Sequence, residues 1–359
     1  MKVDFLKFLA VISAILCAVA CVDERYDLSD VDTEMTVLPG LSFQLENTEN
    51  KIVSFENNVV NKVENLIDIL PEGTIAITQT SQSSVSVGVP QEALAEGYET
   101  AISGSITVRV ADFVNGVLPG ALVYLPIKPV LEVENPSPVP MLLSGKARSA
   151  GHSADFGPYE VPSGKSTIVI DDSSVAALFA PVRDDLTICD LTLKVASSTK
   201  ATRADDTYVI AVNGYAPLSL EPGDEVVVEY SWDKDDLAAY DLAKFAKKYN
   251  VTVESCQVSA EVTSNIPVEI SATGTARLDN GSAEAHTLTP AAPGTPASPV
   301  TTVVVAEASI PEGASSVSAA TVYVTAKVTG SETVYITAEH TLSFQLLEVI
   351  FANGITFKP

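Results

Sequence analysis

The stretch TVYVTAKV, residues 321–328, alternates between two classes of side chain along its whole length. Val322, Val324, Ala326 and Val328 share one face, because successive side chains of a β-strand point to opposite sides. Similar runs rich in Val, Ile and Thr occur at residues 105–110, 167–170, 186–195, 225–230 and 301–305. Many short strands separated by Pro, Gly, Asp and Asn predict a mainly all-β fold built from β-sandwiches rather than an α/β fold.

An internal repeat suggests that this fold occurs twice. The first copy reads NPSPVP at 135–140, SGKAR at 144–148 and VPSGKS at 161–166, and the second reads SNIP at 264–267, TGTAR at 273–277 and IPEGAS at 310–315. Each Pro-x-Gly fits a turn, and we interpret residues 288–300 as an extra loop of the second copy. The sequence therefore predicts two tandem immunoglobulin-like sandwich domains, at residues 120–232 and 251–359. The pentapeptide LSFQL, at 41–45 and 342–346, gives weak further support.

Two segments depart from the strand pattern. From Phe55 the apolar residues Val59, Val63, Leu66, Ile67 and Leu70 follow helical spacing, and Pro71-Glu72-Gly73 ends the segment. We therefore expect residues 51–119 to hold an N-terminal helix followed by strands. A second helix is predicted within a connector at residues 233–250, because acidic residues open it and lysines close it, which suits the helix dipole.

The N-terminus has the organisation of a secretory signal peptide. Lys2 and Lys7 precede an apolar run over residues 8–20, which is shorter than the roughly 20 apolar residues that span a bilayer. Ala18-Val19-Ala20-Cys21 ends the run, so we predict residues 1–20 as the signal peptide, cleavage between Ala20 and Cys21, and lipidation of Cys21. Cys17 is the weaker site, because Leu16 would precede the cut. An ordinary cleaved signal that ends beside a chance cysteine is the alternative.

The residues after Cys21 are acidic and read VDERYDLSDVDT at 22–33. This segment resembles the N-termini of Bacteroidetes surface lipoproteins, in which acids follow the lipidated cysteine. The resemblance covers residues 21–45 closely. The resemblance implies export to the outer membrane and exposure on its outer face, and it implies no particular activity. We assign residues 21–50 to the lipid anchor, an acidic tether and the first strand; a flexible linker that is acidic by chance is the alternative.

The charge of the chain limits its partners. With 21 Lys and Arg against 46 Asp and Glu, the formal charge is −25. Because residues 1–20 hold two lysines and one aspartate, the charge becomes −26 after cleavage. Phosphate backbones and anionic lipid surfaces would repel such a chain, so we expect no nucleic-acid partner and a membrane contact made through the lipid. An apolar content of 46% is sufficient for folded cores.

Two cysteines remain beyond the anchor. Alternation places Cys189 on the face of Leu191 and Leu193, and it places Cys256 on the face of Val258, so both are predicted to point inward. An oxidising compartment permits a Cys189–Cys256 disulfide, and two separate buried thiols fit the spacing as well. No histidine lies near either residue in sequence, which disfavours a metal site.

No catalytic motif is complete. Gly164-Lys165-Ser166-Thr167 is similar to the end of a phosphate-binding loop, but Tyr159 stands where the first glycine is required and a strand follows. The histidines His152, His286 and His340 lack metal-ligand spacing, and we interpret each as a surface residue. The sequence therefore predicts no catalytic residues, no cofactor and no metal site.

Other candidate sites have simpler explanations. The acidic groups Asp30, Asp32 and Glu34, and Asp233, Asp235 and Asp236, lack a calcium-binding loop pattern and fit the tether and a helix start. Trp232 is the only tryptophan, and aromatic residues total 6%, which weakens a sugar-binding interpretation.

We therefore predict a non-enzymatic cell-surface lipoprotein that presents a binding or structural β-sandwich surface to an unknown protein or glycan. A subunit or anchor of a fimbria-like assembly is one alternative, in which residues 346–357 are donated as a strand. We favour the interpretation that these residues are the last strand of their own domain. A surface-polymer hydrolase or a glycan-capture accessory protein that uses Trp232 is the other alternative.

Overall fold

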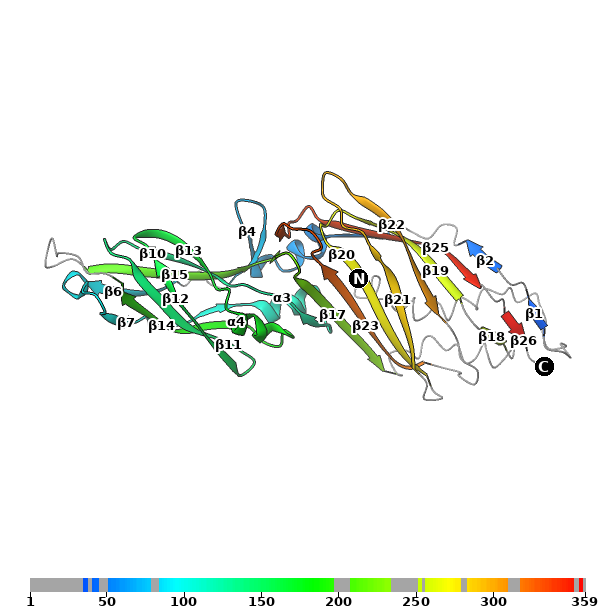
Figure 1. Ribbon diagram of the computed structural model, residues 1–359, viewed down its shortest axis with the longest axis horizontal. Coiled ribbons are helices and arrows are strands. Elements are labelled where there is room, and N and C mark those ends of the chain that lie inside the picture. The colour runs from blue at the N-terminus through cyan, green and yellow to red at the C-terminus, as the bar shows by residue number, and fades with distance from the viewer. Residues whose placement is uncertain are drawn as a thin grey trace. The chain divides into compact units, whose positions relative to one another are not determined.

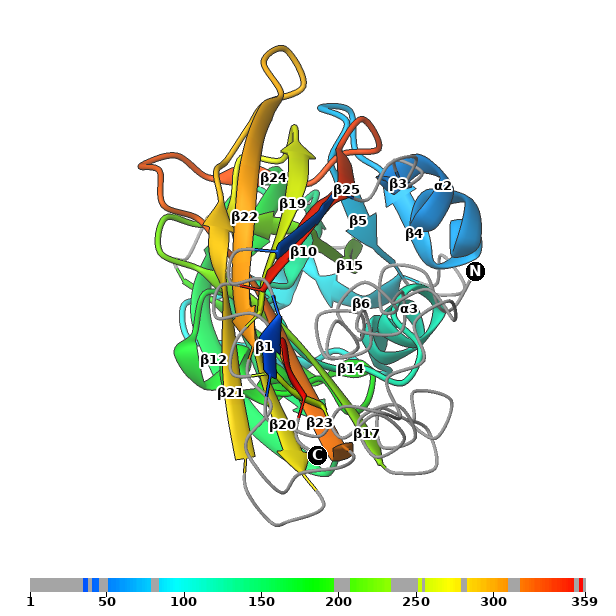
Figure 2. The same cartoon turned by 90° about the vertical axis from the view of Figure 1, so that its right-hand side faces the viewer.

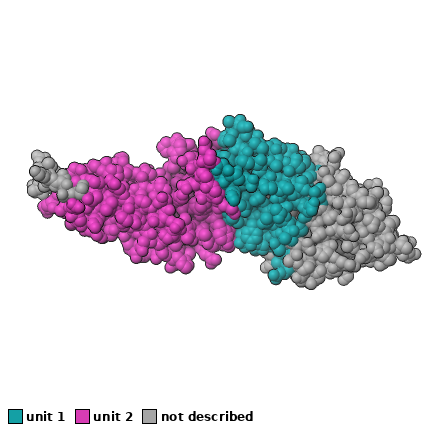
Figure 3. Space-filling model, viewed as in Figure 1, with its two compact units in different colours: residues 1–54, 227–330, 340–359 teal, residues 55–226, 331–339 magenta. Residues whose placement is uncertain are grey.

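The computed structural model describes residues 35–37, 41–44, 51–78, 84–196, 207–233, 251–253, 256–278, 283–308, 317–351 and 355–357. These residues form antiparallel sheets with a few short helices (Figure 1), so the all-β prediction is confirmed. The chain divides into two compact units, which are coloured separately in Figure 3. Unit 1 comprises residues 1–54, 227–330 and 340–359, and unit 2 comprises residues 55–226 and 331–339.

Unit 2 is a sandwich of two sheets. The first has the order β13 (Gly164–Val169), β10 (Val130–Asn135), β15 (Thr207–Pro217), β5 (Ile75–Ile77) and β4 (Ile67–Ile69), with β6 (Val85–Pro90) also paired to β15. The second has the order β12 (His152–Val161), β11 (Met141–Ser149), β14 (Leu186–Val195) and β7 (Glu99–Ala101), with β8 (Ile106–Val108) also paired to β14. The short strands β16 (Ser219–Leu220) and β24 (Val334–Tyr335) pair with each other, and β9 (Leu122–Tyr124) precedes β10.

The two sheets of unit 2 pack closely. Leu131 of the first sheet and Leu143 and Leu191 of the second are fully buried. At Gly214 in β15, an added Cβ would lie 3.1 Å from Ile106 Cγ2 of the other sheet. A larger residue there would push the sheets apart, which explains a glycine in the middle of a strand.

Unit 1 also consists of packed sheets. Four strands lie side by side in the order β21 (Ala283–Ala291), β20 (Glu269–Leu278), β23 (Val317–Lys327) and β17 (Glu225–Asp233). A second sheet has the order β2 (Leu41–Gln44), β25 (Thr341–Phe351), β19 (Cys256–Ser264) and β22 (Val300–Ala308), with β3 (Lys51–Ser54) also paired to β25. A small third sheet contains β1 (Met35–Val37), β26 (Ile355–Phe357) and β18 (Val251–Val253).

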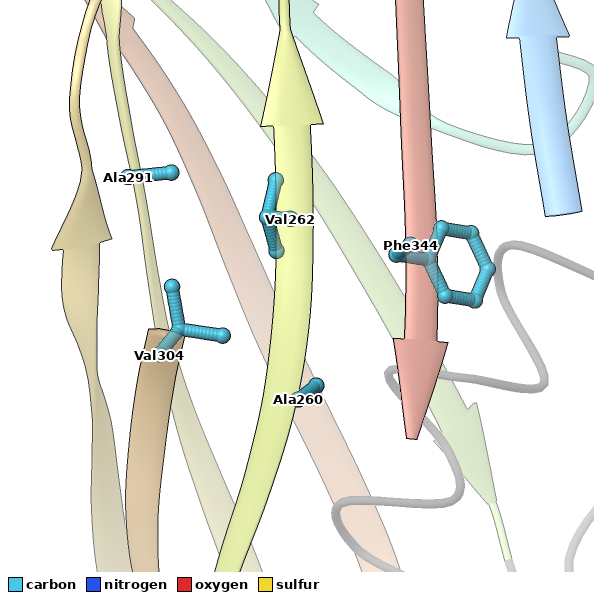
Figure 4. Packing of buried hydrophobic residues seen from close by; sticks show 5 residues of the cluster. All are labelled: Ala260, Val262, Ala291, Val304 and Phe344. Carbon is cyan, nitrogen blue, oxygen red and sulfur yellow. The ribbon is translucent and has the colours of Figure 1, made fainter. Parts of the chain in front are cut away.

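The core of unit 1 lies between its two large sheets. Val262 and Ala260 of β19 lie beside Val304 and Ala291, and Phe344 comes from the neighbouring strand β25 (Figure 4). Ile270 and Leu288 of the opposite sheet pack against this cluster. The predicted alternation in β23 is confirmed, because Val322 and Val328 are buried whereas Tyr323 and Lys327 are exposed.

The internal repeat is present in the strand pairing. In unit 2, β10 pairs with β13 and β15, while β11 pairs with β12 and β14. In unit 1, β19 pairs with β22 and β25, while β20 pairs with β21 and β23. Six strands in the same order along the chain therefore make the same pairs twice.

The detailed alignment of the repeat needs correction. Residues 162 and 163 connect β12 to β13, whereas residues 310–315 lie between β22 and β23 and are not their counterpart. The counterpart is residues 292–299, between β21 and β22, and the predicted extra loop at 288–300 begins inside β21. Short Pro-x-Gly sequences fit many turns, so their recurrence does not identify equivalent ones.

The compact units differ from the predicted order of domains at 51–119, 120–232, 233–250 and 251–359. β6, β7 and β8, from the predicted N-terminal region, pair with β15 and β14 of unit 2. The N-terminal strands β2 and β3 instead pair with β25 of unit 1. The two LSFQL copies are thus neighbours in one sheet and not equivalent strands. Pairing between strands so distant in sequence leaves no local signal.

The helices were predicted less well. The segment from Phe55 forms only α2 (Phe55–Asn58) and two 3₁₀ turns, η2 (Val60–Lys62) and η3 (Glu64–Leu66), before β4 begins. Val59, Val63 and Leu66 are buried, as their spacing suggested, but the pairing of Ile67 with Ile77 converts the end into a strand. The remaining helical elements were not predicted: η4 (Gln91–Ala93), α3 (Val110–Val117), α4 (Ser173–Ala176) and η5 (Ala177–Phe179). The predicted helix at 235–250 lies outside the described residues.

The segment 331–339 completes unit 2 through backbone hydrogen bonds. The Ile336 N–H donates to Leu218 O at 2.9 Å, and the Ile75 N–H donates to Ile336 O at 2.9 Å. Thr337 bridges Thr74 on the same edge.

Replacing Ile336 with proline removes one donor of this segment. Because the N–H is lost and the ring disturbs the pairing, we expect Ile336→Pro to lower the free energy of unfolding by about 2–3 kcal/mol. Ile336→Ala keeps the N–H and serves as the control, since the side chain is only half-buried. Urea unfolding followed by circular dichroism measures both, and equal losses would show that the hydrogen bond is not what stabilises this edge.

Candidate functional site

Several predicted site residues lie outside the described part of the chain. These are the cleavage and lipidation residues Ala20 and Cys21, the tether acids at 30–34, and Asp235 and Asp236. The side chains of Cys256, Trp232 and Asp233 also lie outside it. The lipid anchor, the Cys189–Cys256 disulfide and the role of Trp232 therefore stay predictions.

Cys189 lies at an irregularity in β14. Ser144 pairs with Thr192 but Lys146 pairs with Cys189, so Asp190 and Leu191 stand opposite the single residue Gly145. Asp190 has φ of +52°, as expected in a β-bulge. Cys189 and Leu191 are both buried. The predicted alternation is interrupted by the bulge, because Cys189 follows the buried Ile188 and stands opposite Lys146, so Cys189 does not share the face of Leu191.

The environment of Cys189 disfavours a reactive thiol. Cys189 forms no disulfide among the described side chains, which do not include that of Cys256. Burial raises the pKa of the Cys189 thiol, and the neighbouring Asp190 carboxylate raises it further. Since the thiolate is the reactive form, this environment disfavours a nucleophile. The bulge instead turns Asp190 toward Arg148, whose Nη2 donates to Asp190 Oδ2 at 2.7 Å on the exposed side of the sheet.

Tyr159 and two aspartates form a second polar cluster. The Tyr159 hydroxyl lies 2.7 Å from Asp172 Oδ2 and 2.9 Å from Asp171 Oδ1. Burial and these hydrogen bonds raise the pKa of Tyr159 far above its usual range. The phenol therefore stays protonated and fastens β12 to the segment between β13 and α4.

Asp185 caps the N-terminus of α3, a helix more than 70 residues earlier in the sequence. Its Oδ1 accepts hydrogen bonds from the backbone N–H groups of Ala111 at 2.9 Å and Asp112 at 3.3 Å. These are the first N–H groups of α3, and the N-cap residue Arg109 makes no side-chain cap. Arg109 Nε lies 3.3 Å from Asp185 Oδ2 and partly balances its charge. Burial nevertheless raises the pKa of Asp185, although the Ala111 hydrogen bond and Arg109 oppose this.

Removal of this cap gives a direct test of its role. We expect Asp185→Ala to lower the free energy of unfolding by about 1–2 kcal/mol, since two N–H groups lose their acceptor. Asp185→Asn retains an acceptor oxygen and is expected to lose less. Denaturant unfolding of the two variants decides the point, and an Asn variant as unstable as the Ala variant would contradict the capping role.

Buried asparagines explain the motif that repeats at 135–140 and 264–267. The Asn135 side-chain amide donates to Val139 O at 2.9 Å and to Pro162 O at 3.3 Å, and its Oδ1 accepts from the Ser137 hydroxyl at 2.6 Å. In the second copy, Asn265 Oδ1 accepts from the Thr341 N–H at 2.6 Å. These contacts satisfy buried backbone groups of the connecting loops, so the motif holds loops and is not a ligand site.

The histidines are placed differently from the prediction in two cases. His152 is exposed at the start of β12, as predicted. His286 lies inside strand β21 and His340 directly precedes β25, and both are buried, so the surface interpretation was wrong for them. His286 faces inward because it follows the alternation of β21, and its Nδ1 lies 2.7 Å from Glu307 O.

The remaining motifs can be placed briefly. Gly164-Lys165-Ser166-Thr167 forms the first four residues of strand β13, whereas a phosphate-binding loop leads into a helix. Within the described ranges, no group of three or more His, Cys, Asp or Glu side chains is arranged to hold a metal ion. None of the helices among the described residues has the length and apolar character needed to cross a membrane.

Proline-containing bulges occupy equivalent edge strands of the two repeats. In β12, Gly157 and Pro158 stand opposite the single residue Ser144. In β21, Thr289 and Pro290 stand opposite Ser271. β12 and β21 are the end strands of their sheets. A bulge and a missing N–H at an edge hinder the addition of a foreign strand.

The comparisons with known proteins give distant structural similarity. No protein-family model and no curated protein sequence matches the chain. A protein of Parabacteroides distasonis that is thought to be secreted is similar at 12% identity with a TM-score of 0.45, over 84% of this chain and 99% of that one. A tandem CBM22 domain from Paenibacillus barcinonensis matches at 9% identity with a TM-score of 0.20, over 90% of this chain and 99% of that one. At these values neither similarity bears on activity.

Proposed function

We propose that this chain is a Bacteroidetes-type surface lipoprotein, anchored to the outer membrane through Cys21, which displays a non-enzymatic β-sandwich surface. The observation that carries the proposal is the sequence Ala18-Val19-Ala20-Cys21 after an apolar run, followed by the acidic segment 22–33. A lipidated cysteine with several acyl chains gives a lasting anchor, whereas a chain with charge −25 has no electrostatic attraction to anionic lipid.

The polar clusters of unit 2 support a non-enzymatic role. Asp185 caps α3, Tyr159 joins two segments as a protonated phenol, and Cys189 is a buried thiol. Asp185 and Tyr159 thus have structural tasks, and the environments of Tyr159 and Cys189 work against catalysis. A general base or a nucleophile needs a pKa shifted toward neutrality, and the raised pKa values of Tyr159 and Cys189 are shifted the other way.

Display of a complete domain is favoured over assembly by strand donation. The C-terminal residues proposed as a donated strand pair within their own chain, because β25 lies between β19 and β2, and β26 lies between β1 and β18. The proline bulges of β12 and β21 hinder pairing at those edges. These features support a self-contained protein at the cell surface.

The anchor is tested by replacing the candidate cysteines one at a time. We expect Cys21→Ser to abolish metabolic labelling with radioactive palmitate and to release the protein from the membrane fraction. Cys17→Ser is the matched control and should leave both unchanged, since Leu16 disfavours processing there. Labelling that survives in Cys21→Ser, or is lost in Cys17→Ser, would contradict the assignment. Protease treatment of intact cells, with loss of the full-length band, tests display on the outer face.

A further inference from the structure

The strands β21, β20, β23 and β17 of unit 1 lie side by side (Figure 2). One face of these strands carries buried side chains, and the other carries exposed ones. Ala272 and Ala276 of β20 and Val322 of β23 are buried on the inner face. The residues between them, at odd-numbered positions, therefore point outward. The outer face is thus defined by strand alternation and by measured exposure together.

Hydroxyl groups cover the middle of this outer face. In the strand register, Thr273 stands between Thr287 of β21 and Tyr323 of β23. In the next row, Thr275 stands between Ala285 and Thr321. Thr321 Oγ1 in turn lies 3.1 Å from Ser231 Oγ of β17. Ser271 and Thr325 form a third facing pair. We call this set the hydroxyl face; its members are Ser231, Ser271, Thr273, Thr275, Thr287, Thr321, Tyr323 and Thr325.

The hydroxyl face is accessible and regular. Thr273, Thr275 and Thr287 are exposed, and Tyr323 is 37% exposed. Neighbouring side chains within a row are about 4.8 Å apart, which is the spacing of adjacent strands. Successive rows are about 6.8 Å apart along the strands. Threonine is common on the outer side of strands because of its β-propensity. The contiguous arrangement around one exposed tyrosine is what singles out this face.

The charge distribution selects the kind of ligand. On β21, β20 and β23, the rows through Thr273 and Thr275 contain no charged residue, although the chain holds 46 Asp and Glu. Among the described residues of β20 and β23, the nearest charges on this face are Arg277, Lys327 and Glu269, beyond the hydroxyl rows. In β17, Glu229 lies two residues before Ser231. An uncharged face is complementary to an uncharged ligand, whereas the net charge of the chain opposes the approach of a polyanion.

We propose that the hydroxyl face binds a neutral polysaccharide. Threonine and serine hydroxyls both donate and accept hydrogen bonds, as sugar hydroxyls do. The Tyr323 ring offers an apolar surface for the C–H side of a pyranose and a polar tip for its oxygens. A flat face of several strands suits an extended polymer better than a single sugar. This proposal rests on the proposed display function and gives it a ligand.

Affinity electrophoresis of the full mature chain carrying Cys21→Ser tests this site. The gels contain dextran, soluble starch, arabinoxylan, mannan or laminarin as the neutral probe, or alginate as an acidic one. We expect retardation in at least one neutral gel and none in alginate. Tyr323→Ala and the double variant Thr273→Val/Thr275→Val are expected to bind about tenfold more weakly, a difference that gel retardation measures readily.

Matched controls separate binding from folding. Tyr335→Ala removes a tyrosine that is 52% exposed in unit 2, and Thr167→Val removes an exposed strand threonine of β13, so both should retain binding. Valine keeps the β-branched shape of threonine, and Thr273→Ser/Thr275→Ser restores the hydroxyls and should restore binding.

Three results would overturn the proposal. They are no retardation in any neutral gel, retardation only in alginate, or equal retardation of the hydroxyl-face variants and the controls. Palmitate labelling of Cys21 in cells is independent of all three, so failure here would leave the anchor assignment intact.

Discussion

The structure of unit 1 depends on the pairing of β25, at residues 341–351, with the N-terminal strands β2 and β3. On one side β25 pairs with β19, and on the other its two halves pair with β2 and β3. Phe344 of β25 contributes to the core of this unit. Residues some 300 positions apart must therefore meet before the sheet is complete, and such non-local contacts carry a large entropy cost before they contribute stability.

This constraint explains how the two repeats are arranged along the chain. Most of unit 2 is inserted after β3, at residues 55–226. Residues 227–330 then belong to unit 1, and residues 331–339 belong to unit 2 again. Both repeats keep the same six strand pairs, a proline bulge on an end strand and buried asparagines in a connecting loop. In both repeats the proline bulge protects an open sheet edge, and the buried asparagines form hydrogen bonds with buried backbone groups.

The sequence was sufficient for features that depend on neighbouring residues. Alternation identified β14 and β23, and the repeated motifs indicated two related sandwiches. It failed where distant partners decide the outcome: Ile67 is a strand residue because it pairs with Ile77, and His286 is buried because β21 closes over the core. The hydroxyl face could not be predicted from the sequence either, because its rows cross β20, β21 and β23. Only the strand register brings Thr287, Thr273 and Tyr323 together.

Cross-linking of β2 to β25 tests the central pairing most directly. Ser42 stands opposite Ile350, and directly facing residues of antiparallel strands lie within the Cα separation that a disulfide bridges. We predict that Ser42→Cys/Ile350→Cys forms this bond on mild oxidation, as peptide mapping would show, whereas Ser42→Cys/Glu348→Cys, displaced by two residues, does not. Bond formation in the displaced pair alone, or in neither, would contradict the pairing of the two chain ends on which unit 1 is built.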